Sequence, residues 1–245
     1  MTVARKDFVE RYRQLIEGRQ FVEYRDYYKN SVNRFWISFD RIQRLDLPPG
    51  AKVIDIGGGI MAVLLAKILG LDAAVGDVNR RGFEDVAGHK VRFHDVDLLS
   101  DQQVPDEQFD LVVLQEVIEH LPQPPYIVFD RISKFMKPGG VLFLTTPNGS
   151  RMRNILYLLA GRRVLDNFRY PTPQEALGHQ QEYTLSQLLW QLDRAGMRVD
   201  FGEQYDDGWA GASIQARAMH ALLKPANLVP HLRNGLMIAA RRPAS

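Results

Sequence analysis

Apolar residues follow two different spacings along the chain, and the change of spacing divides it near residue 50. Up to residue 46, apolar and aromatic side chains such as Phe8 and Tyr12 recur at helical spacing, which predicts helices. A Pro-Pro-Gly sequence then ends this part with a turn. We therefore expect an N-terminal helical cap over residues 1–48 and a second domain over residues 49–245.

From residue 51 onward, short apolar runs alternate with amphipathic stretches. This alternation indicates parallel strands joined by right-handed helical crossovers. The expected strands are 52–56, 73–77, 90–95, 109–114, 141–146, 197–201 and 236–240. The expected helices are 60–69, a short one after residue 77, 126–136, 154–159, and one that Thr184 caps and that ends near residues 195–196. The sequence thus predicts an α/β fold with a seven-stranded, mostly parallel sheet, an antiparallel seventh strand and helices on both faces.

Two segments interrupt the alternation, and we expect both to be insertions on the substrate side. One covers residues 148–181 and the other, which we expect to be a loose segment, covers residues 206–233. Within residues 151–163, arginines flank a short apolar stretch. Arginine suits phosphate or carboxylate groups, and basic ends on an amphipathic stretch also suit a weak contact with a membrane surface or a lipid-linked substrate. A lid packed on the core is the alternative interpretation.

A glycine turn follows the first expected strand and precedes a helix. Gly57, Gly58 and Gly59 allow backbone N–H groups to approach a ligand closely at the carboxyl end of a parallel sheet. This spacing also fits a dinucleotide site, but Asp55 lies two residues before the turn, where it would repel a pyrophosphate. Asp55 instead favours a cationic ligand, with a helix cap as the alternative role.

Two further acidic residues end the next two expected strands. Asp77 is 22 residues after Asp55, at the place where a carboxylate accepts hydrogen bonds from both ribose hydroxyls. Asp95 ends the third strand and is placed to accept from an adenine amino group, or else lies in a surface loop. A ribose, an adenine and a positive charge together describe S-adenosylmethionine.

Several motifs occur in a fixed order along the chain. They are Val53–Gly59, Gly76–Asp77, Phe109–Leu121, Lys137–Gly140 and Thr145–Asn148. In these motifs the chain resembles the class I S-adenosylmethionine-dependent methyltransferases, most closely the ubiquinone-biosynthesis-type O-methyltransferases. The resemblance implies a Rossmann-like fold with the seventh strand between the fifth and the sixth. It also implies that the cofactor contacts Asp55, Gly57, Gly58, Gly59, Asp77, Asp95 and the segment at Gln115. Met61 departs from the family, which often has a third glycine there.

A group of acidic residues and a histidine follows the fourth expected strand. If this segment is helical, Glu116, Glu119 and His120 share one face, beside the methyl group to be transferred. His120, or His179 from a later loop, then removes the proton of a substrate hydroxyl. Alternatively all four residues bind a divalent cation such as Mg²⁺, as a similar pattern does in the small-RNA 3′-end 2′-O-methyltransferases. We favour the base, because Mg²⁺ prefers carboxylates and water to two imidazoles.

Composition and charge narrow the function classes. The chain has no cysteine, which excludes disulfides, thiolate metal sites and a cysteine nucleophile, and its net charge of +2 gives no strong nucleic-acid signal. The first residues contain no apolar stretch, so the cytoplasm is the expected compartment. We expect methyl transfer to a hydroxyl of a small molecule or glycan, such as a natural product, quinone precursor or sugar. The alternatives are metal-assisted methylation of a vicinal diol, including an RNA 3′ end, and a non-catalytic cofactor-binding scaffold.

Overall fold

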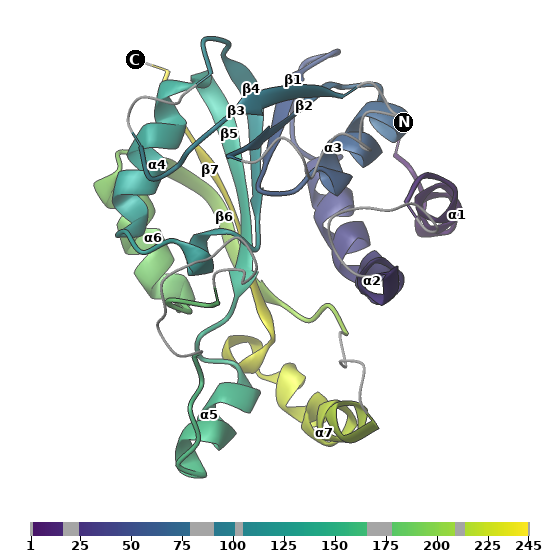
Figure 1. Cartoon of the computed structure of the whole chain (residues 1–245), viewed down its shortest axis with the longest axis vertical. Coiled ribbons are helices and arrows are strands. Elements are labelled where there is room, and N and C mark those ends of the chain that lie inside the picture. Colours follow the sequence, from purple (N-terminus) through teal and green to yellow (C-terminus); the bar gives the residue numbers. More distant parts are fainter. Residues whose placement is uncertain are drawn as a thin grey trace.

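The fold is built on one seven-stranded sheet (Figure 1). The computed structural model describes residues 2–16, 25–78, 91–100, 105–165, 178–208 and 214–244. The strands are β1 (Lys52–Ile56), β2 (Asp72–Asp77), β3 (Arg92–Asp95), β4 (Phe109–Gln115), β5 (Met136–Pro147), β6 (Arg198–Tyr205) and β7 (Gly235–Arg241). Their order is β3-β2-β1-β4-β5-β7-β6, and β7 runs antiparallel to both of its neighbours. The predicted fold class and the place of the seventh strand are confirmed.

Helices cover both faces of the sheet. The helices of the described parts are α1 (Arg5–Leu15), α2 (Arg25–Ile42), α3 (Ile60–Leu64, continued by a π-helical turn Leu65–Leu69), α4 (Pro125–Lys134), α5 (Met152–Leu159), α6 (Leu185–Arg194) and α7 (Ile214–Leu223). Figure 1 shows α1 to α3 on one face of the sheet and α4 with α6 on the other. Each face has its own hydrophobic cluster, because strand residues such as Val53 and Ile54 alternate between them. None of the helices in the described parts of the chain is long and apolar enough to cross a bilayer.

The N-terminal helices share the core of the sheet. Phe8, Tyr12 and Phe39 are fully buried and belong to the same cluster as strand residues of β1 and β4. The rings of Phe8 and Phe39 are 4.8 Å apart, within the range of favourable aromatic pairs. The aromatic residues of α1 and α2 that are described therefore pack into the core. The division into a cap over residues 1–48 and a domain over residues 49–245 stays a prediction.

The structure corrects several predicted boundaries. The segment 206–233 is not loose, because it contains α7 and two 3-10 helices, Lys224–Leu228 and Pro230–Leu232. The helix predicted to end at residue 136 ends at Lys134, and the strand predicted to begin at 141 begins at Met136. The expected turn at Pro138–Gly140 lies inside this strand as an irregularity, with Gly139 at φ +74°.

Other predictions differ less or lie outside the described residues. The strand predicted over 197–201 extends to Tyr205, and the one over 90–95 begins at Arg92. Thr184 caps α6 as expected, since its side chain accepts from the Gln187 N–H. The short helix expected after residue 77 falls within residues 79–90, which are outside the described residues, as is much of the segment 148–181.

The carboxyl ends of the parallel strands meet at one edge of the sheet. Asp77 is paired in register with Asp95, and Gln115 with Thr145. Ile56, the last residue of β1, lies between β2 and β4. Ligands of open α/β sheets bind at this edge, so the fold brings the predicted cofactor residues to the same side of the molecule.

Candidate active site

The glycine turn after β1 packs tightly against the segment that follows β4. Gly57 has φ +73°, a conformation that other residues rarely adopt, and its N–H donates to the Gly76 carbonyl. A Cβ at this position would lie 2.6 Å from a methyl group of Val117. Gly58 packs on the carboxylate of Asp55, which a Cβ there would approach to 3.2 Å. Gly57 thus allows the close approach of the turn to the segment after β4, and Gly58 leaves room for the Asp55 carboxylate.

Asp55 lies under the glycine turn. The side chain is buried, and its carboxylate accepts a hydrogen bond from the Ala62 N–H at 3.1 Å. Burial raises the pKa of Asp55 to about 7, although hydrogen bonds from the N–H groups of Ala62, Gly59 and Met61 partly oppose this. Asp55 therefore accepts hydrogen bonds from N–H groups at the start of the following helix, as the cap interpretation expects. These hydrogen bonds favour the charged carboxylate, and a cationic ligand above the turn would favour it further.

The raised pKa of Asp55 predicts a pH-dependent stability. Because the folded state holds the proton between about pH 4 and pH 7 and the unfolded state does not, stability falls as pH rises through this window. Asp55→Asn keeps an acceptor oxygen and removes the titration. We expect its unfolding free energy to fall less steeply with pH, by up to about 1.4 kcal/mol per pH unit. Urea unfolding at pH 5 and pH 7 measures both slopes, and equal slopes would contradict the shifted pKa.

The next three predicted cofactor residues end adjacent strands. Asp77 and Asp95 stand beside each other at the ends of β2 and β3. The Gln115 side chain donates to Ser38 Oγ at 2.6 Å, while its buried Oε1 has no donor among the described residues. A buried acceptor without a donor is rare and suits an incoming ligand. Carboxylates for hydroxyl groups, a free amide oxygen and an open glycine turn fit an S-adenosylmethionine molecule.

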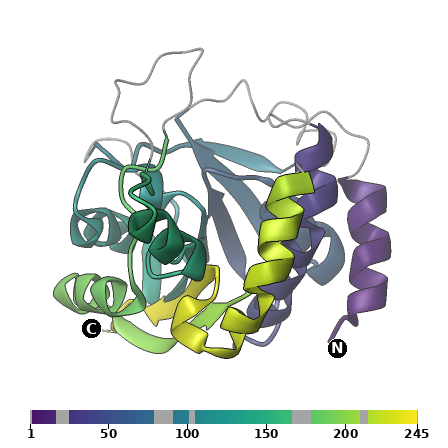
Figure 2. The same cartoon turned by 90° about the horizontal axis from the view of Figure 1, so that it is seen from below.

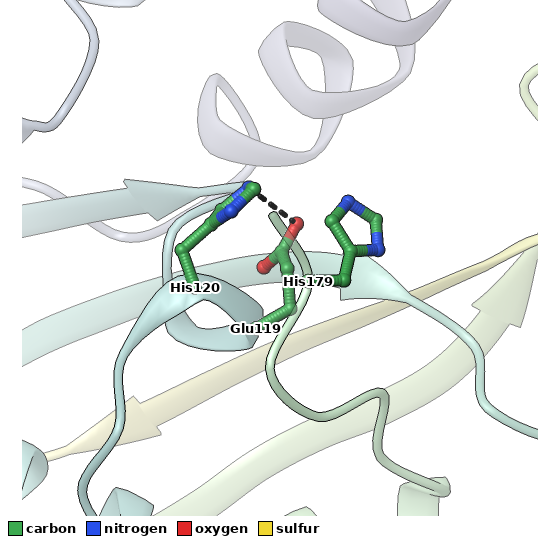
Figure 3. A group of neighbouring side chains, drawn as sticks. All are labelled: Glu119, His120 and His179. Atoms are coloured by element: carbon green, nitrogen blue, oxygen red, sulfur yellow. Dashed lines mark ion pairs between the residues drawn. The ribbon is translucent and has the colours of Figure 1, made fainter. Parts of the chain in front are cut away.

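The structure brings three of the four predicted catalytic residues together. Glu119, His120 and His179 each offer a ligand or base atom within 4.8 Å of one another. Figure 3 shows the Glu119 carboxylate between the two imidazole rings, and its Oε1 lies 3.9 Å from His120 Nε2. The centroids of the two rings are 4.9 Å apart, and the rings are nearly perpendicular. The return of His179 to this site, expected from the sequence, is therefore seen in the structure.

Backbone contacts hold the His179 loop against the Glu119 segment. The Gln180 and Gln181 N–H groups both donate to the Glu119 carbonyl, at 2.7 and 3.2 Å. Glu119 is fully buried; its Oε2 accepts from Thr146 Oγ1, and its Oε1 has no hydrogen-bond donor among the described residues. Burial raises the pKa of Glu119 well above its usual range, and the nearby Glu116 raises it further. A buried carboxyl next to two histidines is a group poised to share a proton or bind a cation.

The residues that orient His179 were not predicted from the sequence. Glu182 Oε1 lies 2.9 Å from His179 Nδ1, and the same carboxylate accepts from Arg151 and Asn154 at 2.5 and 2.6 Å. Burial alone would raise the pKa of Glu182, but these hydrogen bonds and the Arg151 charge hold it below the usual value. Since a charged carboxylate only accepts, Nδ1 is the ring nitrogen that donates to Glu182, and in the neutral imidazole Nε2 is then the acceptor. The signal available in the sequence was Glu182 three residues after His179.

Glu116 does not join this group, which corrects the prediction of one helical face. Only Ile118–His120 forms a helix, a single 3-10 turn, and Glu116 lies before it with φ +55°. Its carboxylate faces Arg34 of α2 at 3.4 Å and accepts from Thr145 Oγ1 at 3.0 Å. A non-glycine residue at positive φ is strained, and such strain is concentrated at functional sites. Glu116 thus forms part of the site wall beneath α2, apart from the two histidines.

Comparison with known sequences decides the family. A sequence profile described as a methyltransferase domain matches residues 23–200. The chain belongs to this family. The class I S-adenosylmethionine-dependent methyltransferase expected from the motifs is confirmed, and this methyltransferase is an enzyme by the same evidence.

Named relatives and solved structures agree with this assignment. The methyltransferase is 28% identical to the ubiquinone biosynthesis O-methyltransferase of Psychrobacter cryohalolentis over 226 residues, 80% of this chain and 81% of that protein. It is 30% identical to the corresponding protein of Hydrogenovibrio crunogenus over 169 residues, 62% and 68% of the two chains.

Solved structures show the same fold at low identity. A methyltransferase structure from Methanosarcina mazei has a TM-score of 0.57 at 16% identity, covering 83% of this chain and 98% of that one. The [4+2]-cyclase SpnF has a TM-score of 0.59 at 20% identity, covering 89% and 84%. Because one neighbour is named for a different reaction, the fold of the methyltransferase does not by itself define its chemistry.

Proposed function

We propose that this methyltransferase transfers a methyl group to a hydroxyl of a small molecule or glycan, such as a quinone precursor, natural product or sugar. The observation that carries the proposal is the orientation of His179. Glu182 accepts from Nδ1, so in the neutral ring Nε2 is the acceptor, and the imidazole lies beside His120 and Glu119. A positioned base of this kind is what a hydroxyl nucleophile requires, because its proton must leave as the oxygen is methylated. The O-methyltransferase names of the relatives support the same acceptor atom.

The residues of this chain divide the work between holding the cofactor and handling the proton. When bound, S-adenosylmethionine supplies the methyl group. Asp77 would accept from the ribose hydroxyls, Asp95 from the adenine amino group, and Gln115 Oε1 from the ammonium group. His179 accepts the hydroxyl proton, and Glu182 stabilises the resulting imidazolium. Much of the acceleration comes from holding the two reactants in line and excluding water.

A second candidate is metal-assisted methylation of an acceptor with adjacent hydroxyls, of which an RNA 3′ end is one example. It is favoured by the Glu119 Oε1, which accepts no hydrogen bond in the described structure, and by the closeness of Glu119 to His120 and His179. The site fits a cation with one carboxylate and two imidazole ligands, and Glu182 would orient His179 as carboxylates commonly orient metal-binding histidines. A divalent cation would there lower the pKa of a bound hydroxyl. We favour the base, because two imidazoles suit Mg²⁺ poorly.

The cofactor assignment predicts a thermal shift. S-adenosylmethionine and S-adenosylhomocysteine should raise the melting temperature, because a ligand that binds only the folded state stabilises it. NAD should not, since Asp55 would face its pyrophosphate. Scanning fluorimetry at one protein concentration compares all three ligands. A shift with NAD alone would overturn the assignment.

The acceptor itself requires a transfer assay. The protein is incubated with S-adenosylmethionine labelled in the methyl group and with panels of phenols, sugars and RNA oligonucleotides. We expect label on a phenol or sugar hydroxyl. Label on the RNA 3′ end, or none on any acceptor despite cofactor binding, would favour the two alternatives, diol methylation or a non-catalytic scaffold.

A further inference from the structure

A pocket lies between α5 and α7, outside the residues assigned to methyl transfer. Both helices project beyond the carboxyl edge of the sheet (Figures 1 and 2). The pocket has a volume of about 280 Å³. Its lining includes Arg153, Leu156, Tyr157 and Arg162 on one side and Met219 and Leu223 on the other. It therefore combines two cationic side chains with a mostly apolar wall.

The two arginines of this pocket have no anionic partner in the described residues. The Arg153 guanidinium lies 5.1 Å from the centre of the Tyr157 ring, and its Nε is buried without an acceptor. Arg162 forms no ion pair within the described parts of the chain. Their neighbour Arg151 differs, because its charge is paired with Glu182. A buried N–H without an acceptor is rare, and a guanidinium edge is shaped for phosphate.

The segments around the pocket are also free of acidic residues and carry exposed apolar side chains. Residues 149–165 and 214–234 contain no aspartate or glutamate. In the same two helices, Leu158, Leu159 and Leu222 expose 66%, 80% and 75% of their surfaces. Exposed apolar surface of this kind suits a partner with an apolar part. The arginines suit an anion, and the apolar lining of Leu156, Met219 and Leu223 suits a chain attached to it.

We propose that the pocket between α5 and α7 binds the phosphate group of an amphiphile. Arg153 and Arg162 hold the phosphate, and the attached alkyl or isoprenoid chain lies on Leu156, Met219 and Leu223. The proposal does not depend on which acceptor is methylated, because the residues that line the pocket are different from Glu119, His120 and His179. Two sources supply this chemistry, a soluble phosphate ester and a lipid headgroup at a bilayer surface.

Calorimetry tests the pocket by measuring the affinity of the protein for three ligands, octyl phosphate, octanol and inorganic phosphate. Octyl phosphate is kept below its critical micelle concentration. We expect octyl phosphate to bind, and to bind at least tenfold more weakly to a protein with Arg153→Gln and Arg162→Gln. Octanol and inorganic phosphate, which each lack one half of the ligand, should bind at least tenfold more weakly than octyl phosphate. The matched control is Arg198→Gln, because Arg198 lies on β6 and is largely exposed. Its affinity should equal that of the unchanged protein.

Folding of the variants is checked by the melting temperature and by S-adenosylmethionine affinity, both expected to be unchanged. If the double variant does not fold, Arg162→Gln alone, at an exposed position, should still weaken octyl phosphate several-fold. Equal affinity of the variants and the unchanged protein, or octanol binding as tightly as octyl phosphate, would overturn the proposal.

Sedimentation with vesicles separates the two sources. Binding to phosphatidylcholine vesicles only when they contain phosphatidylglycerol, lost in the double variant, identifies a lipid headgroup. Octyl phosphate binding without sedimentation identifies a soluble phosphate ester. Absence of both kinds of binding would show that the arginines have no such ligand.

Discussion

Replacing His179 with alanine is expected to lower the turnover number by about 10²–10⁴, the usual contribution of a positioned general base. The affinity for S-adenosylmethionine should stay nearly unchanged, because His179 lies with Glu119 and His120 and not at the ends of β1 and β2 that carry the predicted cofactor residues. Label transfer to the acceptor gives the turnover number, and calorimetry gives the cofactor affinity. A turnover number within threefold of the unchanged protein would remove His179 from the mechanism.

Two variants, Glu182→Gln and its control His231→Ala, test whether the orientation of the His179 ring by Glu182 affects turnover. Glu182→Gln replaces the acceptor of Nδ1–H by an amide and should lower turnover by more than it changes the acceptor's KM. His231→Ala removes an exposed histidine whose contacts with Asn148 and Ser150 use only its backbone carbonyl, and should leave turnover unchanged.

Removal of metal ions by a chelator distinguishes general-base catalysis by the histidines from metal-assisted methylation. If His179 and His120 act only on protons, activity survives extensive chelation and the loss in His179→Ala is not rescued by added cations. If Glu119, His120 and His179 bind a cation, chelation abolishes activity, and excess metal partly restores both the chelated enzyme and the single variants. The observation that would reverse our preference is recovery with added magnesium.

The parts of the fold that could be predicted from the sequence are those whose apolar residues face the core. The strands β1, β2 and β4 are buried on both sides and therefore appear in the sequence as mostly apolar runs. α7 could not be found in this way, because Ile214 and Leu222, two of its described apolar residues, are mostly exposed. Its residues favour a helix by their intrinsic propensity alone.

The candidate site was predictable where it depends on strand ends and not where it depends on long-range ion pairs. Asp77 and Asp95 end two strands that were predicted from the sequence, so the topology of parallel strands brings them together. The pairing of Arg151 with Glu182 joins residues 31 positions apart in the sequence and has no periodic signature. Glu116 was misplaced because its positive φ interrupts the chain after β4 without the glycine that usually marks such a position.

Asp77→Ala is expected to remove roughly 2–4 kcal/mol of cofactor binding, since hydrogen bonds to a charged group contribute about 1.5–3 kcal/mol each and are not additive. This is a loss of about 30- to 1,000-fold in affinity. Asp77 ends β2 next to Asp95, at the edge where the glycine turn also lies, so its carboxylate is placed to accept from both ribose hydroxyls. Asp77→Asn keeps one acceptor oxygen without the charge and should lose an intermediate amount.

Asp72→Ala is the matched control for this loss, because Asp72 begins the same strand at the opposite edge of the sheet and pairs there with Arg92 at 3.0 Å. Exposed ion pairs contribute about 0–1 kcal/mol, so this variant should be nearly as stable as the unchanged protein and bind the cofactor equally well. Calorimetry with S-adenosylhomocysteine measures all three variants without turnover. If Asp77→Ala and Asp72→Ala bind alike, Asp77 has only a structural role, and the ribose must be held by residues other than the carboxylate at the end of β2.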